Sequence, residues 1–221
     1  MKLMKIGFLS LAIVAIASTT ACTNTTTSQK RSDSTPNVED VNNTEHGSMN
    51  HNMEMDLGTA DANYDLRFID AMEMHHQSAV LMAKEAQEKS KRPEIKQLAS
   101  NIIKEQKKEI AQMKQWRQAW YPQASEQPVA YGGANKSVVP MSAKQHENMM
   151  MSEDLGATDA QFDLRFINAM ITHHQGAVTM AKDALNKSER PETKQLAQNI
   201  ITSQQAEIEQ MQQWRKAWYN Q

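Results

Sequence analysis

The sequence predicts an all-α protein, an antiparallel four-helix bundle assembled from two tandem helical hairpins. Residues 65–121 match residues 163–219 without a gap, with 39 of 57 positions identical, so one structural unit occurs twice. Apolar residues within each copy recur with the 3.6-residue period of a helix. Aromatic residues make up only 5% of the chain, which disfavours a β-sandwich or barrel.

The chain begins with a pattern typical of an exported protein. Residues 1–21 combine two lysines with an apolar run too short to span a bilayer, as in a cleavable signal peptide. Cys22 follows directly, as at a lipoprotein cleavage site, but Thr19 stands where that signal usually has Leu. We therefore expect a periplasmic or extracellular protein, with simple cleavage as the plainer outcome and anchoring through a lipidated Cys22 as the alternative. Residues 22–55 are rich in Ser, Thr and Asn and predict a disordered tether.

Each copy predicts two long helices joined by a short break. In copy one, which spans 56–121, the first helix is expected over 61–89 and the second from Pro93 to Trp120. Copy two spans 154–221 and repeats this pattern. A helix of about 28 residues is roughly 42 Å long, and a single hairpin cannot bury both of its faces. We therefore favour one intramolecular bundle over two separate domains.

The segment between the copies, 122–153, contains three prolines and a Gly-Gly pair and predicts a disordered linker. The tether and the linker are both rich in Met and His. Thioethers in a disordered exported segment have no core to fill, so we expect them to capture or pass on metal ions. The candidate ligands are His46, Met49, His51, Met53 and Met55 in the tether and His146 and Met149 in the linker, beside Met141, Met150 and Met151.

Paired histidines flanked by methionines mark the first helix of each copy. Met72, His75 and His76 fall on one face of the predicted helix at 100° per residue. Imidazole and thioether groups on a shared face are a donor set for a metal ion. The candidate ligands in the helices are Met72, His75, His76, Met82 and Met113 in copy one and Met170, His173, His174, Met180 and Met211 in copy two.

Two polar positions interrupt the apolar seam of the second helix, Gln106 and Glu109, and Gln204 and Glu207 repeat them. Folding the hairpin about residues 90 and 91 places the paired histidines level with Gln106, Met72 level with Glu109, and Met113 one turn beyond. We expect a histidine ring N–H to bond Glu109, because this would satisfy the buried carboxylate and orient the ring for metal binding.

The donor types favour copper. Thioethers bind Cu(I) well, and imidazole suits copper in both oxidation states, so we expect Cu(I) or Cu(II) with Ag(I) as a competitor. Met occurs 16 times in the chain, whereas a single Cys excludes internal disulfides and Cys-based zinc sites.

The helical residues also carry a resemblance. Both copies contain a composite motif, which in copy one reads Phe68-Ile69-x-x-Met72-x-x-His75-His76-x-x-Ala79-Val80-x-Met82-Ala83 and then Gln106-x-x-Glu109-Ile110-x-x-Met113-x-x-Trp116. This motif resembles a bacterial family of unknown-function domains with ferritin-like helical bundles. A double-copy exported chain with Met- and His-rich spacers is similar to the cyanobacterial copper-binding members of that family. The resemblance implies copper binding outside the cytoplasm and copper resistance, with the ten helical Met and His residues as ligands. A copper-sensing or copper-export protein is the expected protein partner.

Other functions remain open at this level. Glu73-x-x-His76 has the spacing of a di-iron carboxylate site, but Ile171 replaces that Glu in copy two. A structural or partner-binding bundle at the cell surface is a further alternative, because buried Met and His often serve packing alone. No catalytic constellation is recognisable, so we do not expect an enzyme. The net charge of −2 gives no basic excess for nucleic-acid binding.

Overall fold

The computed structural model describes residues 56–221 and confirms a helical bundle. Each copy forms a hairpin of two long antiparallel helices, and the hairpin connections are extended segments that end at a proline in the first turn of the next helix. The four long helices are α1 (Tyr64–Lys89), α2 (Pro93–Trp120), α4 (Phe162–Lys187) and α5 (Pro191–Tyr219).

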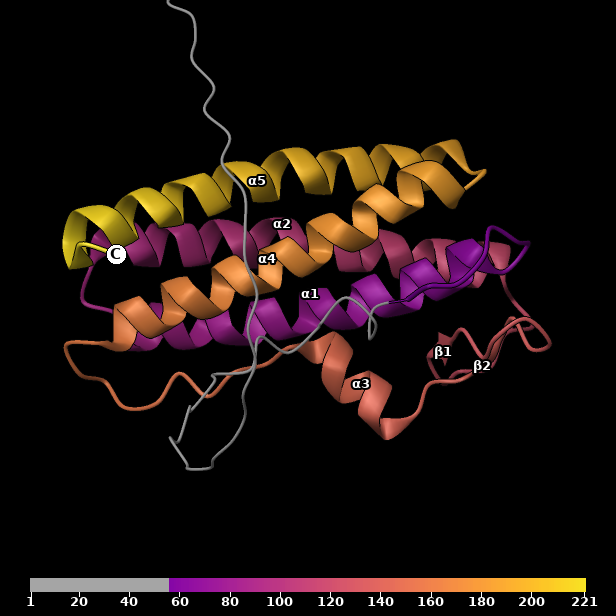
Figure 1. Cartoon of the computed structure of the whole chain (residues 1–221), viewed down its shortest axis with the longest axis horizontal. Helices are drawn as coiled ribbons and strands as arrows, with labels where there is room; N and C mark the ends of the chain where they lie inside the picture. The colour runs from indigo at the N-terminus through magenta and orange to yellow at the C-terminus, as the bar shows by residue number, and fades with distance from the viewer. Residues whose placement is uncertain (1–55) are drawn as a thin grey trace, which may run out of the picture. The chain divides into compact units, whose positions relative to one another are not determined.

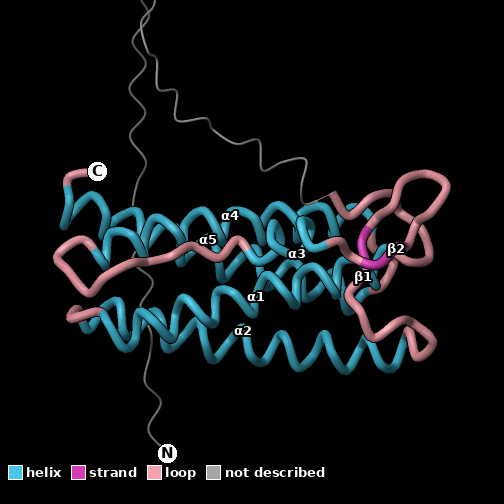
Figure 2. The backbone as a smooth tube through the Cα atoms, turned by 90° about the horizontal axis from the view of Figure 1, so that it is seen from below, coloured by secondary structure: helices cyan, strands magenta, loops and turns pink. Residues whose placement is uncertain are grey.

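The two hairpins pack against each other through α1 and α4, which run antiparallel (Figure 1). In Figure 2 the α1–α2 hairpin lies on one side and the α4–α5 hairpin on the other. The expected single bundle is therefore what the described residues form. Two buried apolar clusters fill its two halves, and each cluster draws residues from both hairpins.

Both hairpins begin three residues later than expected, at Tyr64 and Phe162 instead of 61 and 159. The reason is local hydrogen bonding by an aspartate. The Asp61 carboxylate accepts from the Asn63 backbone N–H and from Arg67, and this turn delays the helix. Asp159 makes the equivalent bonds in copy two.

The linker is ordered, in contrast to the disordered segment that its composition suggested. It contains a two-residue antiparallel strand pair, β1 (Val129–Ala130) and β2 (Val139–Pro140), and the short helix α3 (Ala143–Met150). Ser142 and Gln145 form a capping box at the start of α3. Both α3 and β1 pack on α1, as Figure 1 shows below that helix.

Reciprocal contacts join the ends of the two hairpins. The Arg190 guanidinium lies 4.2 Å from the centroid of the Trp120 ring, and Arg92 lies 4.1 Å from the Trp218 ring in the corresponding place. Both tryptophan rings thus have a partner within the chain. The arginine of each copy stacks on a tryptophan of the other copy in the same way, so an approximate twofold axis relates the two hairpins.

The predicted signal peptide, the tether and Cys22 lie outside the described residues, as do the tether candidates His46, Met49, His51, Met53 and Met55. Within residues 56–221, no helix combines the length and apolar character required to cross a membrane.

Candidate metal centre

Four histidines form a buried layer at the middle of the bundle. His75 and His76 come from α1, His173 and His174 come from α4, and all four are fully inaccessible to solvent. The rings of His75 and His173 meet across the hairpin interface, with centroids 3.7 Å apart and planes tilted by 45°. The layer separates the two apolar clusters, so the structure brings the paired histidines of both copies into one centre.

A carboxylate anchors one histidine of each pair. His76 Nε2 lies 2.7 Å from Glu109 Oε2, and His174 Nε2 lies 2.7 Å from Glu207 Oε2. Because a carboxylate accepts, each Nε2 donates its proton, and a neutral ring in this position has its lone pair on Nδ1. Both Nδ1 atoms are buried without a hydrogen-bond partner. The expected bond to Glu109 is confirmed, and it presents an acceptor nitrogen that a metal ion could use.

The register of the hairpin differs from the expected one by about one helical turn. His76 lies level with Glu109 instead of Gln106, and the Asp70–Arg117 ion pair fixes the same alignment further along. Counting from the middle of the loop ignored these polar contacts between the helices. The shift places Met113 level with Met72.

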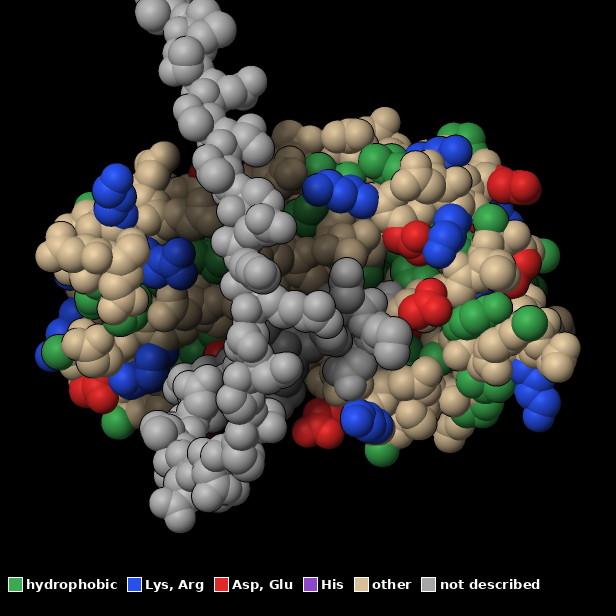
Figure 3. Space-filling view, viewed as in Figure 1, with side chains coloured by type: hydrophobic (Ala, Val, Ile, Leu, Met, Phe, Trp, Pro, Cys, Tyr) green, Lys and Arg blue, Asp and Glu red, His purple; other side chains and the backbone are tan. Residues whose placement is uncertain are grey.

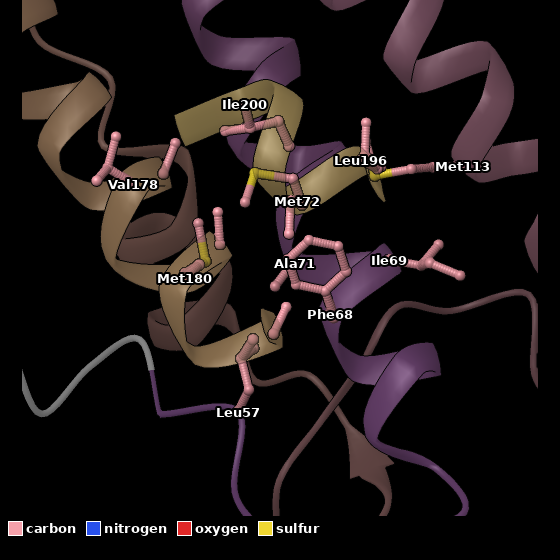
Figure 4. Packing of buried hydrophobic residues seen from close by; sticks show 14 of the residues in the cluster. Leu57, Phe68, Ile69, Ala71, Met72, Met113, Val178, Met180, Leu196 and Ile200 are labelled. Atoms are coloured by element: carbon pink, nitrogen blue, oxygen red, sulfur yellow. The ribbon is translucent and has the colours of Figure 1, made fainter. Parts of the chain in front are cut away.

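The thioethers group across the copies. Met72 of α1 and Met113 of α2 share a cluster with Met180 of α4 and Ile200 of α5 (Figure 4). In the other cluster, Met170 and Met211 pack with Met82 of copy one. All six methionine side chains are buried.

Of the six candidate methionines, each cluster therefore holds two from one copy and one from the other. Assigning Met82 to the same site as Met72 is a misplacement, because seven residues separate it from His75, about 10 Å along α1. We infer that Met72 with Met113, and Met170 with Met211, are the thioethers beside the histidine layer.

The central pair, His75 and His173, is held in the neutral form. Burial lowers the pKa of both imidazoles well below the ordinary value, and the neighbouring histidines lower it further. A neutral imidazole keeps a lone pair for a metal ion. Both nitrogens of His75 and Nδ1 of His173 are buried without a hydrogen-bond partner. Unpaired polar atoms in a core are costly, which favours a ligand at this position.

Metal-free protein should become less stable as the pH falls from 7.5 to 5. The pKa of His75 and His173 is lower in the folded protein than the unfolded value near 6.5, so the unfolded chain binds more protons below that pH. The loss begins near pH 6.5 and levels off only below the folded-state pKa. Melting temperatures recorded across this range would measure it. The H75L/H173L variant should show a smaller fall in melting temperature with pH. The control H146L changes only an exposed ring on α3 and should keep the wild-type pH dependence. An unchanged pH dependence in H75L/H173L would contradict the assignment.

Several candidates lie outside this centre. Gln106 and Gln204 are not hydrogen-bonded to the histidines, and their Oε1 atoms are buried without a partner. His146 is exposed on α3, and Met149 of the same helix is buried at the edge of the bundle, in the apolar cluster that contains Met72 and Met74. Met74, for which the sequence analysis predicts no role, is thus a core residue that packs near α3.

Glu73, the carboxylate of the di-iron alternative, accepts from Gln77 and lies 3.4 Å from Lys114 Nζ. Ser78 was missed, although it lies three residues after His75 and so on the same helical face. Its hydroxyl contacts His173 Nε2 at 2.7 Å.

Among residues 56–221, no three His, Cys, Asp or Glu side chains are arranged to hold a metal ion. Any metal ion held by the histidines would therefore take its further ligands from the methionine thioethers beside the layer. On the face of the molecule shown in Figure 3, acidic and basic side chains are interspersed.

Fold and site together define a class of protein, the two-hairpin helical bundle with a buried histidine layer between thioether clusters. The model of a family described as a domain of unknown function, DUF305, matches residues 65–215, so the chain belongs to the DUF305 family.

Solved structures with the same fold include CopM. Its Cu(II)-bound form is 43% identical with a TM-score of 0.57, covering 70% of this chain and 97% of that one. The Cu(I)-bound form is 41% identical with a TM-score of 0.55 over the same shares. A DUF305 fragment from Deinococcus radiodurans is 28% identical with a TM-score of 0.55, covering 70% of this chain and 96% of that one.

Part of the chain is also similar in sequence to a viral protein. An uncharacterized protein of Acanthamoeba polyphaga mimivirus is 49% identical over 49 residues, which are 22% of this chain and 32% of that protein. The chain thus matches about a third of the length of that relative.

Proposed function

We propose that this protein is an exported copper-binding protein that sequesters or shuttles Cu(I) and Cu(II), and so contributes to copper resistance and homeostasis. The observation that carries the proposal is the histidine layer, in which buried ring nitrogens without hydrogen-bond partners lie between methionine clusters. The role is binding of a metal cargo, not catalysis.

Two lines of support converge on copper as the cargo. Imidazole with thioether is a donor set that suits Cu(I), and imidazole alone also suits Cu(II). The similar protein CopM has been solved in Cu(I)-bound, Cu(II)-bound and Ag-bound forms. Ag(I) is therefore the expected competitor. The signal-like start of the sequence supports export, with the Met- and His-rich tether and the exposed His146 as sites that collect ions or hand them to a copper-sensing or copper-export protein.

A titration with Cu(I) against a chromogenic chelator tests the proposal. Free Cu(I) at about 100 times its Kd should stabilise the native state by about 2.7 kcal/mol, which appears as a rise in melting temperature. The variant H75L/H76L/H173L/H174L should lose this stabilisation and the tightest binding, because the imidazole donors are gone. M74L, a control that changes a buried residue without a proposed role in binding, should retain both. Wild-type protein without a copper-dependent thermal shift would instead favour a purely structural bundle.

A further inference from the structure

The approximate twofold axis sets an expectation for every contact between the copies. Lys89 Nζ of copy one donates to Gly156 O at 2.9 Å, and Lys187 Nζ of copy two donates to Gly58 O at 2.7 Å. The two histidine–glutamate contacts are likewise equal in length. A contact made by one copy should therefore have a counterpart 98 positions along the chain.

The contact of Ser78 breaks this rule. Ser78 is fully buried on α1, and its hydroxyl donates to the backbone carbonyl of His75 at 2.8 Å. Since the hydroxyl proton is used in that bond, we assign the proton of the 2.7 Å contact to His173 Nε2, which donates to the serine oxygen. The His75 backbone carbonyl is a second hydrogen-bond acceptor for the same ring. His173 is thereby fixed with its proton on Nε2 and its lone pair on the buried Nδ1, as His76 and His174 are fixed by their glutamates.

The counterpart of Ser78 is Gly176, which has no hydroxyl to offer His75. Both ring nitrogens of His75 are accordingly without a hydrogen-bond partner. Three of the four histidines in the layer have an anchored N–H group, and His75 alone among them does not. One of the 18 substitutions between the copies thus falls at the centre of the site.

We propose that Ser78 is a positioning residue that makes His173 the stronger and His75 the weaker of the two central imidazole ligands. The inference rests on the proposed function, since it concerns how the same centre holds its metal. Metal-binding histidines usually donate their second ring N–H to a fixed acceptor, and loss of such an acceptor typically weakens metal binding by about 10–100-fold. Ser78 of one hairpin would thus tune a ligand of the other.

The tautomers of the metal-free protein give the first test. In ¹⁵N spectra of the histidine rings, His173 should be a single tautomer protonated on Nε2, whereas His75 should be a mixture. S78A should weaken the preference at His173, where the His75 carbonyl remains as an acceptor. The exchange variant S78G/G176S keeps the composition and should transfer the fixed tautomer to His75. The control S203A removes a helical serine hydroxyl that bonds only backbone carbonyls of its own helix, and should change neither ring.

Cu(I) affinity gives the second test. H173L should weaken binding more than H75L, S78A should weaken it by about 10–100-fold, and the exchange variant should reverse the order of the two histidines. Equal losses for H75L and H173L, with S78A bound as tightly as wild type, would overturn this inference alone. A wild-type protein that binds no Cu(I) would overturn it together with the proposed function. Circular dichroism would show whether each variant is folded. If S78A does not fold, the exchange variant S78G/G176S, which keeps a serine hydroxyl in the layer, still tests the inference.

Discussion

Replacing the four methionines beside the histidine layer should separate Cu(I) binding from Cu(II) binding. Loss of a group that only orients a metal ligand typically weakens binding by about 10–100-fold. In M72L/M113L/M170L/M211L, Cu(I) affinity should fall by more than this, because the variant loses metal ligands themselves. Cu(II) affinity should change far less, because imidazole nitrogens remain. Competition with chelators specific for each oxidation state would measure both. Leu and Met have similar volumes, so each buried exchange should cost less than about 1.5 kcal/mol of stability.

The matched control is M74L. Met74 is buried on the same helix and in the same apolar cluster as Met72, but two residues further along an α-helix it lies about 200° around the axis, away from the face that carries the histidines. Its exchange should therefore leave Cu(I) affinity unchanged. Equal weakening of Cu(I) and Cu(II) in the fourfold variant would show that the methionines serve packing, and would leave the histidines as the whole site.

Removing the guanidinium of Arg67 should be the most destabilising single change outside the site. Arg67 is fully buried and donates to Leu57 O at 2.6 Å, Thr59 O at 2.7 Å, Ser137 O at 2.9 Å and the Asp61 carboxylate. R67M keeps the apolar stem but leaves these acceptors unpaired, so we expect a loss of about 3–5 kcal/mol in the free energy of unfolding. Chemical denaturation would measure it, and amide hydrogen exchange in 131–138 should become faster.

Arg165 is the equivalent residue of copy two and provides the control. It makes the corresponding bonds to Leu155 O and Ala157 O, but its side chain is 35% exposed and no linker covers it. R165M should cost about 1 kcal/mol or less, because water can replace the lost donor. Similar losses for both variants would mean that the linker contributes nothing to the stability of the bundle.

The helices and the histidine–glutamate contact were predictable because both depend on local spacing. The repeat doubles the periodic signal, and Glu109 is one of only two polar positions on an apolar seam. A buried carboxylate requires a donor, and the paired histidines of the neighbouring helix supply it. Pro93 and Pro191 mark the starts of the second helices for an equally local reason, since proline suits the first turn.

Features that depend on tertiary geometry were not predictable. The one-turn error in register arose because side chains such as Asp70 and Arg117, and not equal counts from the loop, align the helices. The grouping of Met180 with Met72 requires knowledge of how α4 crosses α1. The order of the linker arises from contacts with α1, which its prolines and glycines do not reveal. The role of Ser78 emerges only when His173 is brought from 95 residues away.

The approximate twofold axis also has an evolutionary consequence. A protein with a single hairpin would need a second molecule to cover its buried helix face, and the resulting isologous dimer would have the same residue on both sides of the axis. Such a dimer could not place serine on one side and glycine on the other. Joining two hairpins in one chain removes that constraint, so each half of the centre can be selected separately. The difference between Ser78 and Gly176 is therefore a specialisation that a dimer of identical hairpins could not acquire.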